Sequence, residues 1–135
     1  MPSDCIFCRI AAGREPAFIV YEDAQFLAFL DKYPQSPGHL QLIPKTHVRW
    51  IYDLPEMGTI FSVAQRIIRA IIPVLSADHI SVGTFGREVH HAHIWIVPQY
   101  GRDRKISEGS GRPIEEDRVK MMQKLRAVLS KEVSK

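Results

Sequence analysis

The sequence has few cysteines, no strong excess of one charge, and no apolar run that approaches the length of a membrane span. Its 135 residues include 18 Lys or Arg and 15 Asp or Glu, a net charge of +3. This small surplus is weak support for anionic ligands and none, by itself, for nucleic-acid binding. The first residues, 1–4, lack a basic segment followed by an apolar one. We therefore expect a cytoplasmic protein with no membrane partner and no specific nucleic-acid partner.

The two cysteines form a single Cys-x-x-Cys, Cys5 and Cys8. In a reducing compartment this spacing favours metal binding or redox chemistry over a structural disulfide. A redox motif needs a strand-to-helix context that this segment does not supply. The remaining alternative is two reduced cysteines without a metal. The length predicts one domain over 1–135, in which 101–135 form a C-terminal loop and helix extension.

The most informative stretch is 89–98, which is rich in β-branched and aromatic residues and ends at Pro98. It reads as a strand that Pro98 closes. Because side chains alternate along a strand, His91, His93 and Trp95 should share one face. The other face is mostly apolar and suits contact with a helix. Two imidazoles on one rigid face suggest a chemical site, although a pair of exposed histidines on a solvated sheet is the plainer reading.

The rest of the pattern predicts an α+β domain with an antiparallel sheet, because short turns connect successive strands. One sheet face should carry a long amphipathic helix, and His91 and His93 should lie on the opposite face. The turn Gly86-Arg87 should join the fourth and fifth strands. The expected elements are a helix over 5–12, strands over 18–21, 25–30, 39–43 and 80–85, a helix from near Pro55 that Pro73 ends or kinks, a polar loop over 100–112, and a terminal helix marked by Val119, Met122, Leu125 and Leu129.

Six stretches, in order, resemble the histidine-triad (HIT) family of nucleotide hydrolases and transferases, whose signature is three histidines alternating with apolar residues. The resemblance implies a two-layer fold with a five-stranded antiparallel sheet, paired across a homodimer into a ten-stranded one. It also implies a site for a nucleoside mono- or dinucleotide phosphate. The matching stretches are Asp4-Cys-Ile-Phe-Cys-Arg-Ile10, Tyr21-Glu-Asp23, Ala28-Phe-Leu-Asp31, Pro37-Gly-His39, Leu40-Gln-Leu-Ile-Pro-Lys-Thr-His47 and His91-Ala-His-Ile-Trp95.

The resemblance implies that His93 is the nucleophile that attacks the α-phosphorus and forms a nucleotidyl-histidine, which water then hydrolyses. His91 and Trp95 stand at the other two triad positions. Trp95 departs from the family, because an indole N–H donates one hydrogen bond but cannot exchange a proton. His90 cannot substitute, since strand alternation places it on the other face.

Further family positions imply a nucleotide-binding set. Asp31 matches the acidic residue that hydrogen-bonds ribose hydroxyls, although a carboxylate in such a loop often only caps a turn. The apolar positions match the lining of a base pocket but equally suit plain core. We find no counterpart of the asparagine that many members place before the triad, and Glu88 stands where a hydroxyl residue is common. The set is Ile6, Phe7, Ile10, Phe29 and Asp31, with Arg87 as a compensating cation near the phosphate.

The resemblance also implies a zinc ion held by Cys5, Cys8, His47 and His91, as in bacterial-type members. Cys₂His₂ is a closed tetrahedral donor set, which suits a structural ion. A helix N-terminus lowers thiol pKa values, which would favour metal binding by the cysteines.

Three functions remain open at this point. The first is an enzyme that cleaves or transfers nucleoside phosphates at His93. The second is a nucleotide-binding protein with weak or no turnover because Trp95 replaces the third histidine. The third is a zinc-stabilised interaction module without nucleotide.

Overall fold

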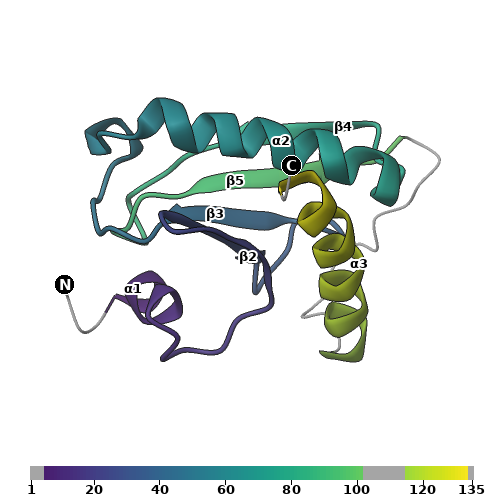
Figure 1. Ribbon diagram of the computed structural model, residues 1–135, viewed down its shortest axis with the longest axis horizontal. Coiled ribbons are helices and arrows are strands. Elements are labelled where there is room, and N and C mark those ends of the chain that lie inside the picture. The colour runs from purple at the N-terminus through teal and green to yellow at the C-terminus, as the bar shows by residue number, and fades with distance from the viewer. Residues whose placement is uncertain (1–4, 102–114, 134–135) are drawn as a thin grey trace.

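The computed structural model describes residues 5–101 and 115–133 (Figure 1). The loop predicted over 100–112 therefore lies almost entirely outside the described residues. The elements are α1 (Ile6–Ala11), β1 (Ile19–Glu22), β2 (Phe26–Leu30), β3 (Leu40–Pro44), a 3₁₀ turn (Ile51–Asp53), α2 (Met57–Leu75), β4 (His79–Gly83), β5 (Ile94–Gln99) and α3 (Glu115–Val133).

The strands form one 5-stranded sheet in the order β1-β2-β3-β5-β4, and each neighbouring pair is antiparallel. Helix α2 lies along one face of this sheet, and α3 packs against β1 and α2. Helix α1 lies apart from the other two helices (Figure 1). The predicted α+β class and antiparallel sheet are confirmed.

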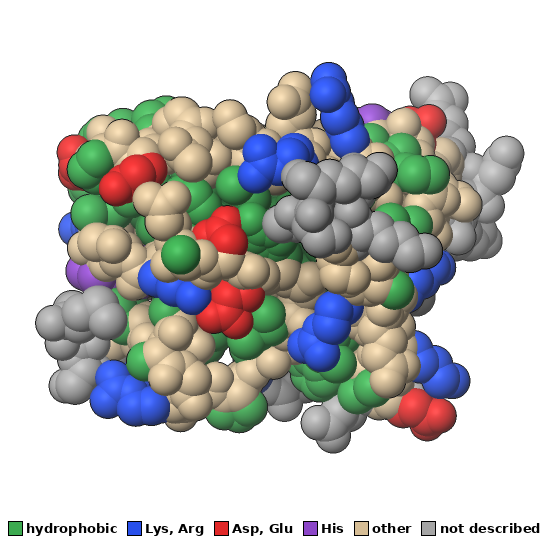
Figure 2. Space-filling view, in the orientation of Figure 1, with side chains coloured by type: hydrophobic (Ala, Val, Ile, Leu, Met, Phe, Trp, Pro, Cys, Tyr) green, Lys and Arg blue, Asp and Glu red, His purple; other side chains and the backbone are tan. Residues whose placement is uncertain are grey.

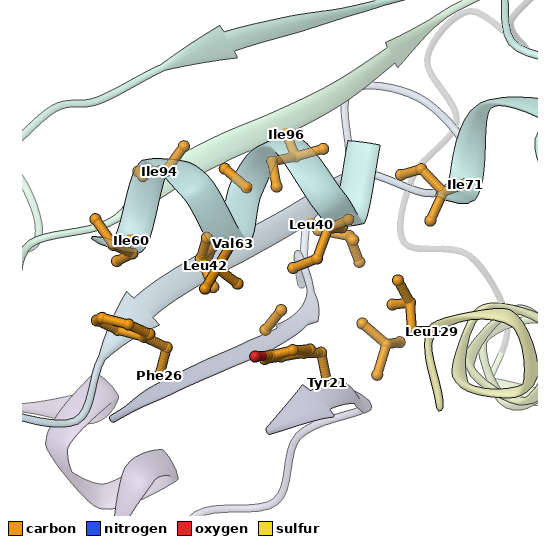
Figure 3. Close-up of a cluster of buried hydrophobic side chains, with 14 of the residues drawn as sticks. Tyr21, Phe26, Leu40, Leu42, Ile60, Val63, Ile71, Ile94, Ile96 and Leu129 are labelled. Atoms are coloured by element: carbon orange, nitrogen blue, oxygen red, sulfur yellow. The ribbon is translucent and has the colours of Figure 1, made fainter. Parts of the chain in front are cut away.

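Helix α2 follows from apolar residues spaced to form one buried stripe. Its side chains Ile60, Val63 and Ile71 meet strands β3 and β5 in the main core (Figure 3). The prediction that Pro73 ends the helix is wrong, because the helix continues to Leu75; the alternative of a kink at Pro73 stays a prediction. Pro73 lies in the last turn, where loss of one backbone N–H disrupts little of the helix. The helix ends at Ser76, which takes a left-handed conformation with φ of 54°.

The same helix corrects the expectation that no segment approaches a membrane span. Its 19 residues, with a mean hydropathy of 1.4, are long and apolar enough to cross a membrane by length and composition alone. Core helices pass the same test, and this one buries a stripe of side chains against the sheet.

Strand β5 begins later than predicted, at Ile94, so His91 and His93 precede the strand. The backbone N–H of Ala92 donates to the carbonyl of Val48, which draws this segment away from the sheet ladder. The connection from β4 is accordingly longer than a tight turn at Gly86-Arg87. Alternation still holds, since Ala92 and Ile94 join the core beneath α2.

Pro98 does not close the strand as predicted, because β5 continues to Gln99. The pairing of β3 with β5 ends where Leu40 lies opposite Ile96. Pro98 therefore lies beyond the end of β3. Among the described strands, β4 alone flanks Pro98, which pairs there with Ile80. A strand tolerates proline where no partner needs its N–H.

The sheet face opposite α2 carries a second, smaller apolar cluster. Phe7 and Ile10 of α1 cover Leu27, Phe29 and Ile43 of strands β2 and β3. Helix α1 is one residue shorter at each end than the predicted 5–12 helix, and Cys5 caps it by accepting a hydrogen bond at Sγ from the N–H of Cys8. This face is the one on which the polar residues of interest gather.

Candidate functional site

Four residues predicted as metal ligands converge between α1, the loop after β3 and the segment before β5. The Sγ atoms of Cys5 and Cys8 lie 3.3 and 3.4 Å from Nδ1 of His91. His47 Nδ1 lies 3.2 Å from Cys8 Sγ and 3.2 Å from His91 Nδ1. The four ligand atoms all lie within 4.8 Å of one another, and the sequence-predicted set is therefore brought together.

This geometry fits a tetrahedral metal ion. Ordinary zinc bonds to sulfur and nitrogen separate neighbouring donor atoms by about 3.3–3.8 Å, close to the spacings in the cluster. His91 Nε2 lies 2.8 Å from the carbonyl oxygen of Pro44 and is placed to donate to it. That bond leaves Nδ1 of His91 unprotonated and directed at the cysteines, the usual arrangement for a ligating histidine. The Cys₂His₂ group can hold a metal ion.

Protonation of the Cys8 thiol opposes metal binding more strongly than the sequence analysis predicted. Burial, followed by the neighbouring Cys5, raises the pKa of the Cys8 thiol to about 11. The expectation that a helix N-terminus lowers the pKa is wrong for Cys8 in the metal-free protein, because burial and the neighbouring Cys5 raise the pKa of this thiol. Binding of a metal must therefore displace a thiol proton, and the affinity should rise with pH.

His93 is buried beside this cluster, and the backbone carbonyl of His91 orients its ring. Nδ1 of His93 lies 2.8 Å from the carbonyl oxygen of His91, so Nδ1 carries the proton and Nε2 the free lone pair. Thr84 Oγ1 donates to the carbonyl of His93 at 2.7 Å and holds the backbone. Burial lowers the pKa of His93, and the bond to His91 and the charge of Asp31 offset this only in part. The neutral, nucleophilic imidazole is thus the stable form at neutral pH.

Asp31 follows β2 and lies buried on the same sheet face. One carboxylate oxygen accepts from the backbone N–H of Tyr33 at 2.8 Å, and the other accepts from Gln41 Nε2 at 2.7 Å. Nε2 of His39 lies 3.5 Å from the second oxygen. The turn-capping role weighed from sequence is real, but the contacts to Gln41 and His39 also fix this carboxylate toward the sheet.

Trp95 lies half-buried in an aromatic group that the sequence did not predict. Its ring meets His39 edge-on at 4.7 Å between centroids and Phe85 at 4.9 Å. Phe85 also lies 6.3 Å from His93. Trp95 Nε1 is buried and has no hydrogen-bond partner among the described residues.

Some of the predicted base-pocket residues make contacts between rings, and the others pack as ordinary apolar side chains. Phe7 meets Phe29 at 5.4 Å, and it meets His91 and His93 at 5.8 Å each. Ile10 is buried in the same cluster and Ile6 packs at its edge. The structure therefore brings an apolar wall directly against the two histidines.

Arg87 and Glu88, in contrast, are exposed in the connection between β4 and β5. The Arg87 carbonyl oxygen lies 3.1 Å from Nε2 of His90, which is also exposed. Contact of the Arg87 guanidinium with a phosphate stays a prediction.

Sequence reasoning missed three residues that complete this face, namely His39, Gln41 and Phe85. Gln41 is the cross-strand partner of both Phe29 and Trp95, which places it between the predicted pocket and the triad. Alternation within β3 offered the signal, because His39, Gln41 and Ile43 share a face of that strand. Nothing in the sequence pattern signalled Phe85.

Comparison with known proteins identifies relatives of this chain. An uncharacterised HIT-like protein of Saccharolobus solfataricus is 36% identical over 109 residues, spanning 76% of this chain and 78% of that protein. Adenylylsulfatase HINT3 of Arabidopsis thaliana is 32% identical over 110 residues, 76% of this chain and 56% of that protein. Adenosine 5′-monophosphoramidase HNT1 of Saccharomyces cerevisiae is 30% identical over 115 residues, 83% of this chain and 72% of that protein.

Solved structures show the same fold. A zinc-bound histidine triad family protein of Mycobacterium smegmatis superposes with a TM-score of 0.83 at 35% identity, covering 97% of this chain and 96% of that one. A Hit-like protein of Bartonella henselae gives 0.82 at 29% identity, covering 94% and 97%. The family model for the HIT domain matches residues 12–102. With the histidines, the sheet and the relatives in agreement, this chain belongs to the HIT domain family.

Proposed function

We propose that this protein hydrolyses or transfers nucleoside phosphates through a covalent nucleotidyl intermediate on His93. The observation that carries the proposal is the state of that ring: neutral, with Nδ1 bonded to the His91 carbonyl and Nε2 carrying the lone pair. Two relatives are named an adenylylsulfatase and an adenosine 5′-monophosphoramidase, and both names describe an adenosine nucleotide conjugate as the substrate.

The reaction proceeds in two displacements. The lone pair of His93 Nε2 attacks the α-phosphorus, a P–N bond forms, and the bond to the leaving group breaks with its electron pair on the leaving atom. Positive charge develops on the ring and is stabilised by the Nδ1–H bond to His91. Water then attacks the same phosphorus and gives its proton to solvent, and the P–N electron pair returns to Nε2.

The surrounding residues bind and orient the nucleotide. Phe7 and Phe29 supply an apolar wall for the base, and Asp31 supplies acceptors for ribose hydroxyls. Cys5, Cys8, His47 and His91 would hold zinc, which in a closed donor set stabilises the fold and fixes ligand orientation. His91 in turn fixes His93 through its carbonyl. Positioning of this kind accounts for much of the barrier reduction in phosphoryl transfer.

Trp95 favours a second candidate, a nucleotide-binding protein with weak or no turnover. Its indole cannot protonate a leaving group, so solvent must supply that proton. The neutral His93 beside the site favours the enzyme, since binding alone needs no free imidazole nitrogen there.

The proposal extends to a cytoplasmic homodimer of single-domain chains that binds neither membranes nor a specific nucleic acid. Strand β4 is an outer edge of the sheet and largely exposed, whereas α3 packs against the opposite edge, β1. On the face in Figure 2, acidic and basic side chains are scattered, and neither sign forms a continuous patch. Sedimentation should give a mass twice that of the chain, and a monomer would contradict the dimer.

The direct test is incubation of the purified protein with a diadenosine polyphosphate or adenosine phosphoramidate, followed by measurement of released adenosine monophosphate. His93→Ala should lower kcat by roughly 10³-fold or more, the scale on which loss of a nucleophile acts. Binding of the monophosphate should change by no more than about tenfold, ~1.4 kcal/mol. The matched control is His90→Ala, which removes an exposed histidine of the same segment. A His93→Ala variant with near-normal turnover would remove this mechanism.

A further inference from the structure

Phe85 is a large apolar side chain that remains exposed next to the nucleophile. It lies two residues beyond the end of β4, and 53% of its surface is accessible. Gly83 allows this placement, because a Cβ at that position would approach the Phe85 ring to 3.1 Å. The missing side chain lets the ring fold back over the sheet to reach Trp95, at 4.9 Å between centroids.

Phe85 and Phe7 flank His93 on different sides. Phe7 packs with residues of β2 and β3, whereas Phe85 extends from β4 and contacts Trp95 of β5. The strand order β2-β3-β5-β4 therefore places the two rings on either side of the histidine. The wall on the Phe7 side is buried, and the Phe85 side is open to solvent.

The two sides of His93 would contact different parts of the substrate. Under the proposed function the nucleoside lies against Phe7 and Phe29, so the group attached to the far side of the phosphorus is left to the Phe85 side. An exposed phenyl ring held against an indole offers a face for offset or edge-to-face contact with another planar ring. Neither residue supplies a positive charge for a second phosphate or a titratable group for a basic amine.

We infer that Phe85 and Trp95 form a leaving-group subsite that selects nucleotide conjugates whose leaving group carries a planar aromatic ring next to the scissile bond. This inference rests on the proposed function, whose site it extends. Phe85 is the specificity-determining residue, and the absence of a side chain at Gly83 leaves room for its ring.

The test compares two adenosine phosphoramidates whose amines have matched basicity, one arylmethyl and one alkyl. Wild-type protein should prefer the arylmethyl substrate by about tenfold in kcat/KM. Phe85→Ala should bring this ratio close to one, chiefly by lowering kcat/KM for the arylmethyl substrate. Phe85→Leu, which keeps apolar bulk without a ring, should lie between them. Tyr52→Ala, which removes another exposed aromatic ring at 67% accessibility, should keep the wild-type ratio.

A ratio near one in wild-type protein, or a preference that survives in Phe85→Ala, overturns the subsite. Phosphonate analogues with the same two groups on a carbon–phosphorus bond separate this result from failure of the proposed function. If neither phosphoramidate is cleaved, the proposed function fails, and the phosphonate dissociation constants decide the subsite. A tenfold preference that Phe85→Ala abolishes supports it, and equal constants reject it.

Discussion

The two ends of the segment from His91 to Trp95 differ in how completely their polar atoms are satisfied. At the His91 end, Nε2 faces the Pro44 carbonyl and Nδ1 faces the two thiols. At the Trp95 end, Gln41 Oε1 and Trp95 Nε1 are buried without a hydrogen-bond partner among the described residues, and His39 Nε2 has only a long, 3.5 Å contact to the Asp31 carboxylate.

An unsatisfied buried polar atom lowers the stability of the folded protein by about 1–3 kcal/mol. Such atoms are therefore expected mainly at functional sites. The His91 end has the organisation of a structural site, and the Trp95 end that of a binding surface. The predictions below separate the two ends by asking which one changes stability and which one changes substrate choice.

The largest expected effect lies at the His91 end. Removal of metal by a strong chelator, or Cys8→Ser, should lower the free energy of unfolding by about 4 kcal/mol, because the ion binds only the folded donor set. Metal analysis should give about one zinc per chain in the wild-type protein. His79→Ala, which removes an exposed histidine on β4, should retain the metal and the stability. An unchanged free energy of unfolding after chelation would contradict a structural role for the His91 end.

At the other end, Trp95→His should change substrate choice more than stability. A basic amine needs a proton as it leaves, and a restored imidazole can supply it, an effect typically worth roughly 10²–10⁴-fold. The kcat/KM for a simple alkyl phosphoramidate should therefore rise relative to that for a dinucleotide. Because imidazole is smaller than indole, both rates can rise together, and only the ratio is informative. An unchanged ratio would mean that Trp95 shapes the pocket alone.

Gln41→Leu sharpens the comparison within the Trp95 end. The substitution removes an unsatisfied oxygen and the hydrogen bond to Asp31, so stability should stay within about 1 kcal/mol. Ribonucleotide affinity should fall about fivefold, ~1 kcal/mol, as the carboxylate loses its anchor. Affinity for the 2′,3′-dideoxy analogue should not change. Equal losses for both nucleotides would show that Gln41 acts through the base pocket.

The smallest effect near neutral pH is the pH dependence of the rate. Because burial lowers the pKa of His93, its nucleophilic form persists as pH falls through the ordinary histidine range near 6.5. We expect kcat/KM to decline only below that value and then by about tenfold per pH unit. A midpoint above 6.5 would contradict the buried, neutral ring.

The four candidate metal ligands at the His91 end were predictable because the residues that bind metals are chemically distinctive and matched the family pattern. The late start of β5 was not, since it depends on the hydrogen bond from Ala92 to Val48. His39, Gln41 and Phe85 meet Trp95 through strand register and a long connection, neither of which the spacing of residues shows. The same limit applies to Arg87, whose exposure no pattern indicated.

The most direct test of the central claim is to look for the covalent intermediate itself. The protein is mixed with an adenosine phosphoramidate, quenched in base within milliseconds to seconds, digested, and analysed by mass spectrometry. The account predicts an added adenylyl group on the peptide that contains His93, present during turnover, absent after substrate is exhausted, and absent in His93→Ala. Adenosine monophosphate released at a normal rate without any labelled His93 peptide would contradict it.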